Sequence, residues 1–194
     1  WVHRVDRQVV GVCGPDAVAL HADVPTHGHN LTTHADATVS AGDRVTFVLS
    51  WFPSHLPVPR PTDPWQALTS TERFWTDWAA RSTYDGPYRE AVLRSLLTLK
   101  ALTYQPTGGI VAAPTTSLPE DIGGVRNWDY RYCWLRDSAF TLDALIRSGY
   151  VEEAKAWRDW LLRAIGGNPD DLQVMYGIGG ERRLVEYELD WLPG

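Results

Sequence analysis

The strongest signal in this sequence is the stretch Asn127-Trp128-Asp129-Tyr130-Arg131-Tyr132-Cys133-Trp134-Leu135-Arg136-Asp137-Ser138. It places four aromatic rings and two pairs of Arg and Asp within twelve residues, at the entrance to a predicted helix. Guanidinium and carboxylate groups need partners wherever water is excluded. Aromatic faces beside planar hydrogen-bonding groups suit a sugar, which offers apolar C–H faces and a rim of hydroxyls. The stretch therefore predicts a carbohydrate site, and the alternative is an Arg–Asp pair that braces a loop.

Helices are predicted on both sides of this stretch. Residues 89–103 are apolar around most of the circumference of a helix, so neighbours must cover it on several sides. Asp137 or Ser138 is expected to cap a second helix, and Gly149 is expected to end it. A third helix is predicted over residues 151–165. The apolar positions expected to face inward on the last two helices are Ala139, Leu142, Ile146, Ala154, Leu161 and Ile165. Glu152 and Glu153, in the first turn of the third helix, favour its dipole.

Residues 1–58 predict β-structure. Short β-prone runs at 8–12, 17–22 and 45–50 are separated by turn sequences that contain Gly, Pro and Asp. An antiparallel sandwich is the expected architecture, truncated at its start. Five prolines at positions 53 to 64 then indicate a linker, and residues 69–72 fit a capping box that opens a short helix.

The segment 123–137, Gly-Gly-Val-Arg-Asn-Trp-Asp-Tyr-Arg-Tyr-Cys-Trp-Leu-Arg-Asp, resembles the signature of glycoside hydrolase family 15. That family contains glucoamylases and a bacterial branch with trehalases. Residues 94–102, 108–120 and 186–194 resemble it too. The resemblance implies a multidomain α and β protein with three parts. These are the C-terminal part of a β-sandwich (1–58), a Pro-rich linker with a short helix (59–86), and the first third of an (α/α)6 barrel (87–194).

The resemblance also implies roles for four residues. Arg136 and Asp137 would hydrogen-bond the hydroxyls of a terminal glucose, Trp134 would shape the wall, and Tyr130 would lie near the ring oxygen and the developing oxocarbenium charge. The family inverts the anomeric carbon with two carboxyl groups, and both lie downstream of anything that resembles this sequence. The expected function is therefore part of a hydrolase of α-glucosidic bonds, trehalase-like or glucoamylase-like, with the sugar subsite but no catalytic residue in this chain.

Two other classes of function stay open at this point. One is a non-catalytic carbohydrate-binding or regulatory protein that kept the pocket. The other is an all-β interaction module with a helical appendage.

The remaining motifs carry weaker signals. His27, His29 and His34 lie in a predicted polar loop, and without a carboxylate at fixed spacing they do not predict a metal site. Residues 177–180 read as a turn rather than a nucleotide loop, so no cofactor is expected. Glu186, Glu188 and Asp190 alternate as they would on an exposed strand.

The resemblance implies a carbohydrate as the partner, and composition argues against two other kinds of partner. A net charge of −6 without a basic run argues against nucleic acid. No apolar stretch approaches the length that spans a bilayer. Cys13 and Cys133 lie far apart, so neither a disulfide framework nor a zinc site is predicted, and a cytoplasmic location with reduced thiols is expected. The sequence does not predict an oligomeric state.

Overall fold

The computed structural model describes residues 1–116, 118–167 and 169–188. The chain divides into two compact units, Trp1–Phe74 and Trp75–Gly194. The division runs through helix α1 (Pro64–Ala80), inside the stretch predicted as a linker. The three-part division expected from the sequence stays a prediction.

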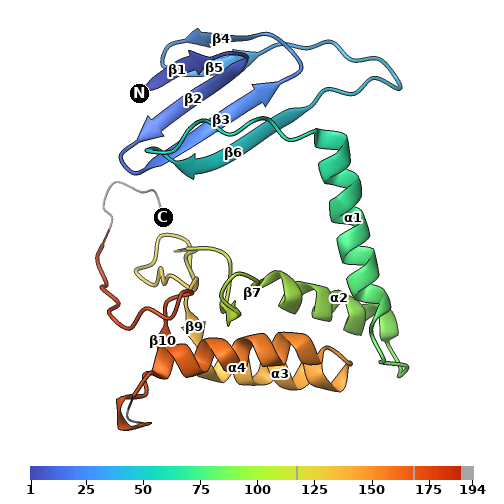
Figure 1. Ribbon diagram of the computed structural model, residues 1–194, viewed down its shortest axis with the longest axis vertical. Helices are drawn as coiled ribbons and strands as arrows, with labels where there is room; N and C mark the ends of the chain where they lie inside the picture. Colours follow the sequence, from blue (N-terminus) through green and yellow to red (C-terminus); the bar gives the residue numbers. More distant parts are fainter. Residues whose placement is uncertain (117, 168, 189–194) are drawn as a thin grey trace. The chain divides into compact units, whose positions relative to one another are not determined.

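The first unit is built on a four-stranded antiparallel sheet (Figure 1). Its strand order is β1 (Val2–Val5), β2 (Gln8–Cys13), β3 (Asp16–Ala22) and β6 (Phe47–Pro53). Gly14 has a φ of +59°, which lets the chain turn tightly between β2 and β3. On one face of the sheet, Val10, Ala17, Ala19 and Phe52 form a buried apolar cluster. The predicted β-structure of residues 1–58 is thus confirmed.

The opposite face of this sheet is apolar and exposed. Phe47, Leu49 and Trp51 alternate along β6 with Phe52 and the other inward residues, and Val18 of β3 lies directly opposite Trp51. Within residues 1–74, all of which the structure describes, the other strands are β4 (Thr26–His29) and β5 (Thr32–Ala35), which pair only with each other. The second sheet of the expected sandwich therefore stays a prediction.

Helix α1 begins earlier than the sequence predicted. The Asp63 carboxylate accepts hydrogen bonds from the backbone N–H of Trp65 and Gln66 at 2.9 and 2.8 Å, which makes Asp63 the cap. Pro64 fits the first helical position because its missing N–H would have no partner there. The capping box predicted at residues 69–72 is wrong. The Ser70 hydroxyl instead bonds the Gln66 carbonyl inside the helix at 2.8 Å.

The three helices predicted between residues 89 and 165 are present in the second unit, and the last has the predicted bounds. They are α2 (Arg89–Ala101), α3 (Leu135–Arg147) and α4 (Val151–Ile165). Helices α3 and α4 form a hairpin joined by residues 148–150, and Gly149 stops α3 with a φ of +94° (Figure 1). Gly166 ends α4 with a φ of +36°. In the described part of the chain, no helix combines the length and apolar character needed to cross a membrane.

The start of α3 and the inward faces of α3 and α4 differ from the prediction. Neither Asp137 nor Ser138 caps α3: Trp134 occupies the N-cap without a side-chain bond, and the Leu135 N–H donates to the Val174 carbonyl at 3.2 Å. Leu142 is buried as predicted and Leu161 packs against an apolar cluster, whereas Ala139 and Ile146 are exposed. The buried residues of the two helices are Ser138, Thr141, Leu142, Leu145, Glu153, Trp160 and Ala164.

Glu153 is a buried carboxylate, and its place in the first turn of α4 does not explain it. Its side chain is 5% exposed. Its Oε1 accepts a hydrogen bond from Trp78 Nε1 at 2.7 Å and lies 3.1 Å from Lys100 Nζ and 3.4 Å from Arg81 Nη2. Burial raises the pKa of this carboxyl, but the hydrogen bonds from Trp78 and Lys100 outweigh it, so the pKa lies below its usual value. Glu153 thus ties α1, α2 and α4 together beside the stacked rings of Trp78 and Tyr150.

Short strands surround the second apolar cluster of this unit. They are β7 (Thr103–Tyr104), β8 (Gly109–Ile110), β9 (Cys133–Trp134) and β10 (Met175–Tyr176); a short 3-10 helix, Pro169–Asp171, precedes β10. Cys133, Trp160 and Tyr176 are fully buried together. The turn predicted at residues 177–180 is confirmed, because Gly180 N donates to the Gly177 carbonyl at 2.9 Å. Residues 181–188 form no regular strand, so the alternation of Glu186 and Glu188 has no strand to support it, and Asp190 lies outside the described residues.

Candidate functional site

The segment that carries the aromatic residues is held by backbone hydrogen bonds on both sides. Ala113 N donates to the Tyr130 carbonyl and Ala112 N to the Tyr132 carbonyl, each at 3.0 Å. On the other side β9 pairs antiparallel with β10, with Trp134 opposite Met175. The buried Cys133 anchors the segment in the apolar cluster, where burial raises the pKa of its thiol to about 12. Residues 130–134 therefore have a fixed backbone from which their side chains project.

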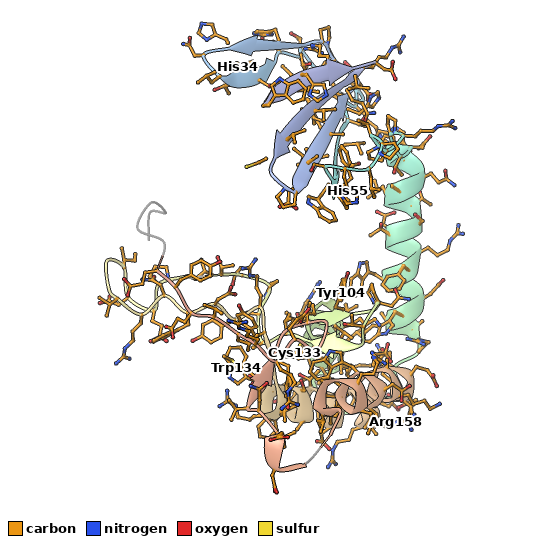
Figure 2. All side chains as sticks on the ribbon, turned by 60° about the vertical axis from the view of Figure 1, so that its left-hand side comes forward. His34, His55, Tyr104, Cys133, Trp134 and Arg158 are labelled. Atoms are coloured by element: carbon orange, nitrogen blue, oxygen red, sulfur yellow. The ribbon has the colours of Figure 1, made fainter. Side chains whose placement is uncertain are left out.

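Two aromatic rings lie beside that of Trp134. The ring of Tyr130 lies 5.9 Å from that of Trp134, and the ring of Tyr132 meets Trp134 edge-on at 6.4 Å. Trp134 is half-buried, whereas Tyr130 is 36% exposed. Figure 2 labels Trp134 beside Cys133 at this part of the unit. A supported but accessible ring face is what the C–H face of a sugar requires.

Arg136 and Asp137 lie in the first turn of α3, directly after this cluster. Arg136 Nη2 donates to Asp137 Oδ2 at 3.1 Å. The two side chains are 73% and 36% exposed, so water or a ligand can reach both. A guanidinium offers several donors in a fixed fork and a carboxylate only accepts, so the pair can bind neighbouring hydroxyls of opposite hydrogen-bonding sense.

A shallow open pocket of about 320 Å³ joins two of the predicted site residues. Trp134 and Arg136 line it together with Leu135, and the chain before β10 closes the other side through Leu172, Gln173 and Val174. Tyr130 and Asp137 lie next to the pocket. The Tyr130 ring contacts the ring of Trp134, and the Asp137 carboxylate pairs with the Arg136 guanidinium. The four predicted residues thus lie as one group, although only Trp134 and Arg136 line the pocket itself.

Three charged residues beside this group, Asp129, Arg131 and Glu120, had no predicted role in the site. The Asp129 carboxylate pairs with the Arg131 guanidinium at 2.8 Å, and the hydrogen bond from Arg131 holds the pKa of Asp129 below its usual value. Glu120 Oε1 lies 3.5 Å from the Tyr130 hydroxyl, at the outer limit of a hydrogen bond. Asp129 and Arg131 could be found from their place in the motif. Nothing in the sequence around Glu120 indicates its approach to Tyr130, because the chain between them folds back.

The three histidines form a different arrangement from the predicted loop. They lie on the β4–β5 hairpin, where His27 faces His34 across the two strands with ring centroids 5.7 Å apart. In the part of the chain that the structure describes, no group of three or more His, Cys, Asp or Glu side chains is placed to hold a metal ion.

Comparison with known proteins links this site to one family. The model of glycosyl hydrolases family 15 matches residues 86–194, which is 109 of the 194 residues and includes the whole aromatic and charged group. No solved structure matches the chain.

The relatives among curated proteins include three trehalases. The chain is 45% identical over 165 residues to the trehalase of Mycolicibacterium smegmatis and 44% identical over 164 residues to that of Mycobacterium tuberculosis. It is 46% identical over 134 residues to the trehalase of Thermoplasma acidophilum. The matches cover 82%, 82% and 68% of this chain but only 24%, 24% and 23% of the relatives, so the chain spans about a quarter of their length. Because the family model covers more than half of the chain and the motif that forms the pocket, this chain belongs to glycosyl hydrolases family 15.

Proposed function

We propose that this chain is part of an inverting glycoside hydrolase that cleaves α-glucosidic bonds, with trehalose as the substrate. The observation that carries the proposal is the pocket at Trp134 and Arg136, where a ring wall, a guanidinium and the adjacent Asp137 carboxylate meet. Trehalose is favoured over starch-type ends because the curated relatives with these identities are trehalases.

In this proposal Arg136 and Asp137 recognise the hydroxyls of the terminal glucose. Arg136 donates from its planar fork, and Asp137 accepts. Each hydrogen bond to a charged group contributes about 1.5–3 kcal/mol, which is enough to decide which pattern of hydroxyls is admitted. Trp134 packs on the apolar side of the sugar. Tyr130 lies where the oxocarbenium charge develops, as the family resemblance implies.

The general acid and base are proposed to lie outside this chain. An inverting hydrolase needs two carboxyl groups about 6.5–9.5 Å apart, on opposite sides of the scissile bond. Such a reaction uses no metal or cofactor, so none is proposed. Binding of the sugar and alignment of its anomeric carbon are the tasks of the residues in this chain.

The same proposal includes the architecture of the whole protein. The uncovered apolar face with Phe47, Leu49 and Trp51 supports a β-sandwich in which a second sheet packs on that face. The α3–α4 hairpin supports an (α/α)6 barrel, which is built from such hairpins. A cytoplasmic location stays a prediction that rests on the two unpaired cysteines.

The test is made in the full-length protein that contains this sequence. Arg136→Lys keeps the charge but loses the fork, and Asp137→Asn keeps the shape but loses the anionic acceptor. We expect each change to lower kcat/KM for trehalose at least about tenfold, which is about 1.4 kcal/mol, with little change in Tm. The matched controls are Arg158→Lys and Asp159→Asn, because Arg158 and Asp159 form a similarly exposed pair of neighbours on α4 at 2.8 Å.

The outcomes separate the classes of function. Hydrolysis of trehalose by the wild type, lost in the pocket variants but kept in the controls, supports the proposal. Faster hydrolysis of maltose than of trehalose would make the protein glucoamylase-like. Sugar binding without hydrolysis would make it a carbohydrate-binding or regulatory protein. A large fall in Tm with unchanged kinetics would make Arg136 and Asp137 a structural brace.

A further inference from the structure

Asp129 and Arg131, the residues before and after Tyr130, are joined by several hydrogen bonds. Asp129 Oδ1 accepts from both the backbone N–H and Nε of Arg131, at 3.0 Å each. Asp129 Oδ2 accepts from Arg131 Nη2 at 2.8 Å. One carboxylate thus holds both the main chain and the side chain of the residue two positions further on. The backbone between them is that of Tyr130.

The surroundings fix Tyr130 at two further points. The Tyr130 carbonyl accepts the Ala113 N–H at 3.0 Å, so the backbone is held from both sides. The Tyr130 hydroxyl points toward Glu120 Oε1, 3.5 Å away. Glu120 is itself held, since its backbone N–H donates to the Arg126 carbonyl at 3.1 Å and its carboxylate lies 3.6 Å from Arg126 Nη1.

Stability alone does not account for the Asp129–Arg131 pair. The Arg131 side chain is 57% exposed, and ion pairs at such positions contribute little to the free energy of folding because water screens them. The effect of the pair is local instead: its three short bonds remove conformational freedom from one residue. That residue is the tyrosine whose ring lies 5.9 Å from Trp134 in the candidate site.

We propose that Asp129 and Arg131 form a clamp that positions Tyr130 against the sugar, and that Glu120 orients the Tyr130 hydroxyl. This inference rests on the proposed function. Asp129, Arg131 and Glu120 are positioning residues, since they act through Tyr130. The hydrogen bond from Arg131 lowers the pKa of the Asp129 carboxyl below its usual value.

The clamp makes a specific kinetic prediction for the full-length enzyme. Because Tyr130 is expected to act on charge that develops in the transition state, Asp129→Asn and Arg131→Lys should lower kcat about 10- to 100-fold and leave KM nearly unchanged. Arg136→Lys, by contrast, removes a contact that is present before reaction and should raise KM as well. Asp143→Asn is the matched control. Asp143 Oδ1 and Oδ2 both bind Arg147 Nε at 2.8 Å on the exposed side of α3, away from the pocket.

A double-mutant cycle tests whether the effect passes through Tyr130. In a Tyr130→Phe background the loss caused by Asp129→Asn should fall to less than about threefold, because the hydroxyl that the clamp positions is already absent. Full additivity of the two losses, or a wild-type kcat in both Asp129→Asn and Arg131→Lys, would overturn the proposal. Two variants are used so that, if one of them misfolds, the other still tests the proposal.

Amide hydrogen exchange gives a readout that does not depend on activity. The Arg131 N–H is protected by Asp129 in the wild type, so its exchange should accelerate at least about tenfold in Asp129→Asn and stay unchanged in Asp143→Asn. An unprotected Arg131 amide in the wild type would refute the clamp even if the enzyme is a trehalase. Clamp-dependent protection in a protein that hydrolyses no α-glucoside would refute the proposed function and retain the clamp.

Discussion

Replacing Lys100 with Met removes the ammonium group that faces the buried Glu153 carboxylate. Lys100 Nζ lies 3.1 Å from Glu153 Oε1, and the two side chains are only 15% and 5% exposed. Met keeps the length and the apolar stem of Lys, so the change deletes the charge and little packing. The Trp78 hydrogen bond at 2.7 Å and the half-exposed Arg81 at 3.4 Å remain. The carboxylate thus keeps part of its compensation but loses its most buried cation.

Breaking a buried ion pair by removal of one partner costs about 3–5 kcal/mol, because an uncompensated charge is left behind. Since Trp78 and Arg81 remain, we expect a smaller loss, about 2–4 kcal/mol in the free energy of unfolding. The matched control is Lys155→Met. Lys155 pairs with Glu152 at 2.8 Å on the same helix as Glu153, but with side chains that are 56% and 71% exposed. That variant should lose no more than about 0.5 kcal/mol.

The loss of stability in Lys100→Met should also become smaller at acidic pH. The pKa of Glu153 is lowered in the folded state, so its stabilising contribution is present above the unfolded value of about 4.3 and is lost as the pH falls through the folded value. In Lys100→Met the carboxyl can take up a proton more readily, so acid relieves the defect. Urea unfolding of the full-length protein at pH 7 and at pH 4 measures both effects. Equal losses in Lys100→Met and Lys155→Met, or a Lys100→Met loss that does not shrink at pH 4, would refute the reasoning.

Three further predictions concern the 194-residue chain by itself. If the general acid and base lie outside it, as proposed, the purified chain should release no glucose from trehalose above a heat-killed control. Its exposed Leu49 and Trp51 should bind a hydrophobic dye such as ANS, and Trp51→Ser should reduce the fluorescence gain at least about twofold, which a spectrofluorimeter checks directly. Cys13 should react with a thiol reagent at pH 8 within minutes, whereas Cys133, with a pKa of about 12 and no exposure, should react only when denaturant is added.

The sequence predicted the elements whose limits are set locally. Helix α4 runs from Val151 to Ile165, as predicted, because an apolar period and the following Gly166 are both contained in the segment. The turn at residues 177–180 was found for the same reason. The start of helix α1 was predicted wrongly, because Pro64 was counted with the prolines of the linker. Pro64 takes the first position of the helix instead, and Asp63 rather than residues 69–72 caps it.

What the sequence could not predict depends on residues far apart in the chain. Glu153 was interpreted as a dipole partner, yet it is buried because Trp78 and Lys100 come from two other helices. The inward face of α3 includes Ser138 and Thr141, which hydrophobicity alone does not select. The same division holds in the candidate site. Trp134 and Arg136 come from one local motif, whereas Gln173 and Val174 complete the pocket only because β9 pairs with β10.

Along the aromatic motif, residues that fix the backbone alternate with residues that lie at the candidate site. Cys133 turns into the apolar cluster and fixes the strand, while its neighbour Trp134 remains half-buried beside the pocket. Asp129 and Arg131 hold the backbone on either side of Tyr130, whose ring faces Trp134. Residues that fix the backbone therefore alternate with residues of the candidate site. Much of the support for the site thus comes from the motif itself. In the function that we propose, this segment keeps the sugar subsite in shape while the groups that perform the chemistry come from elsewhere in the protein. Its charged pairs then need not stabilise the fold to be required for function.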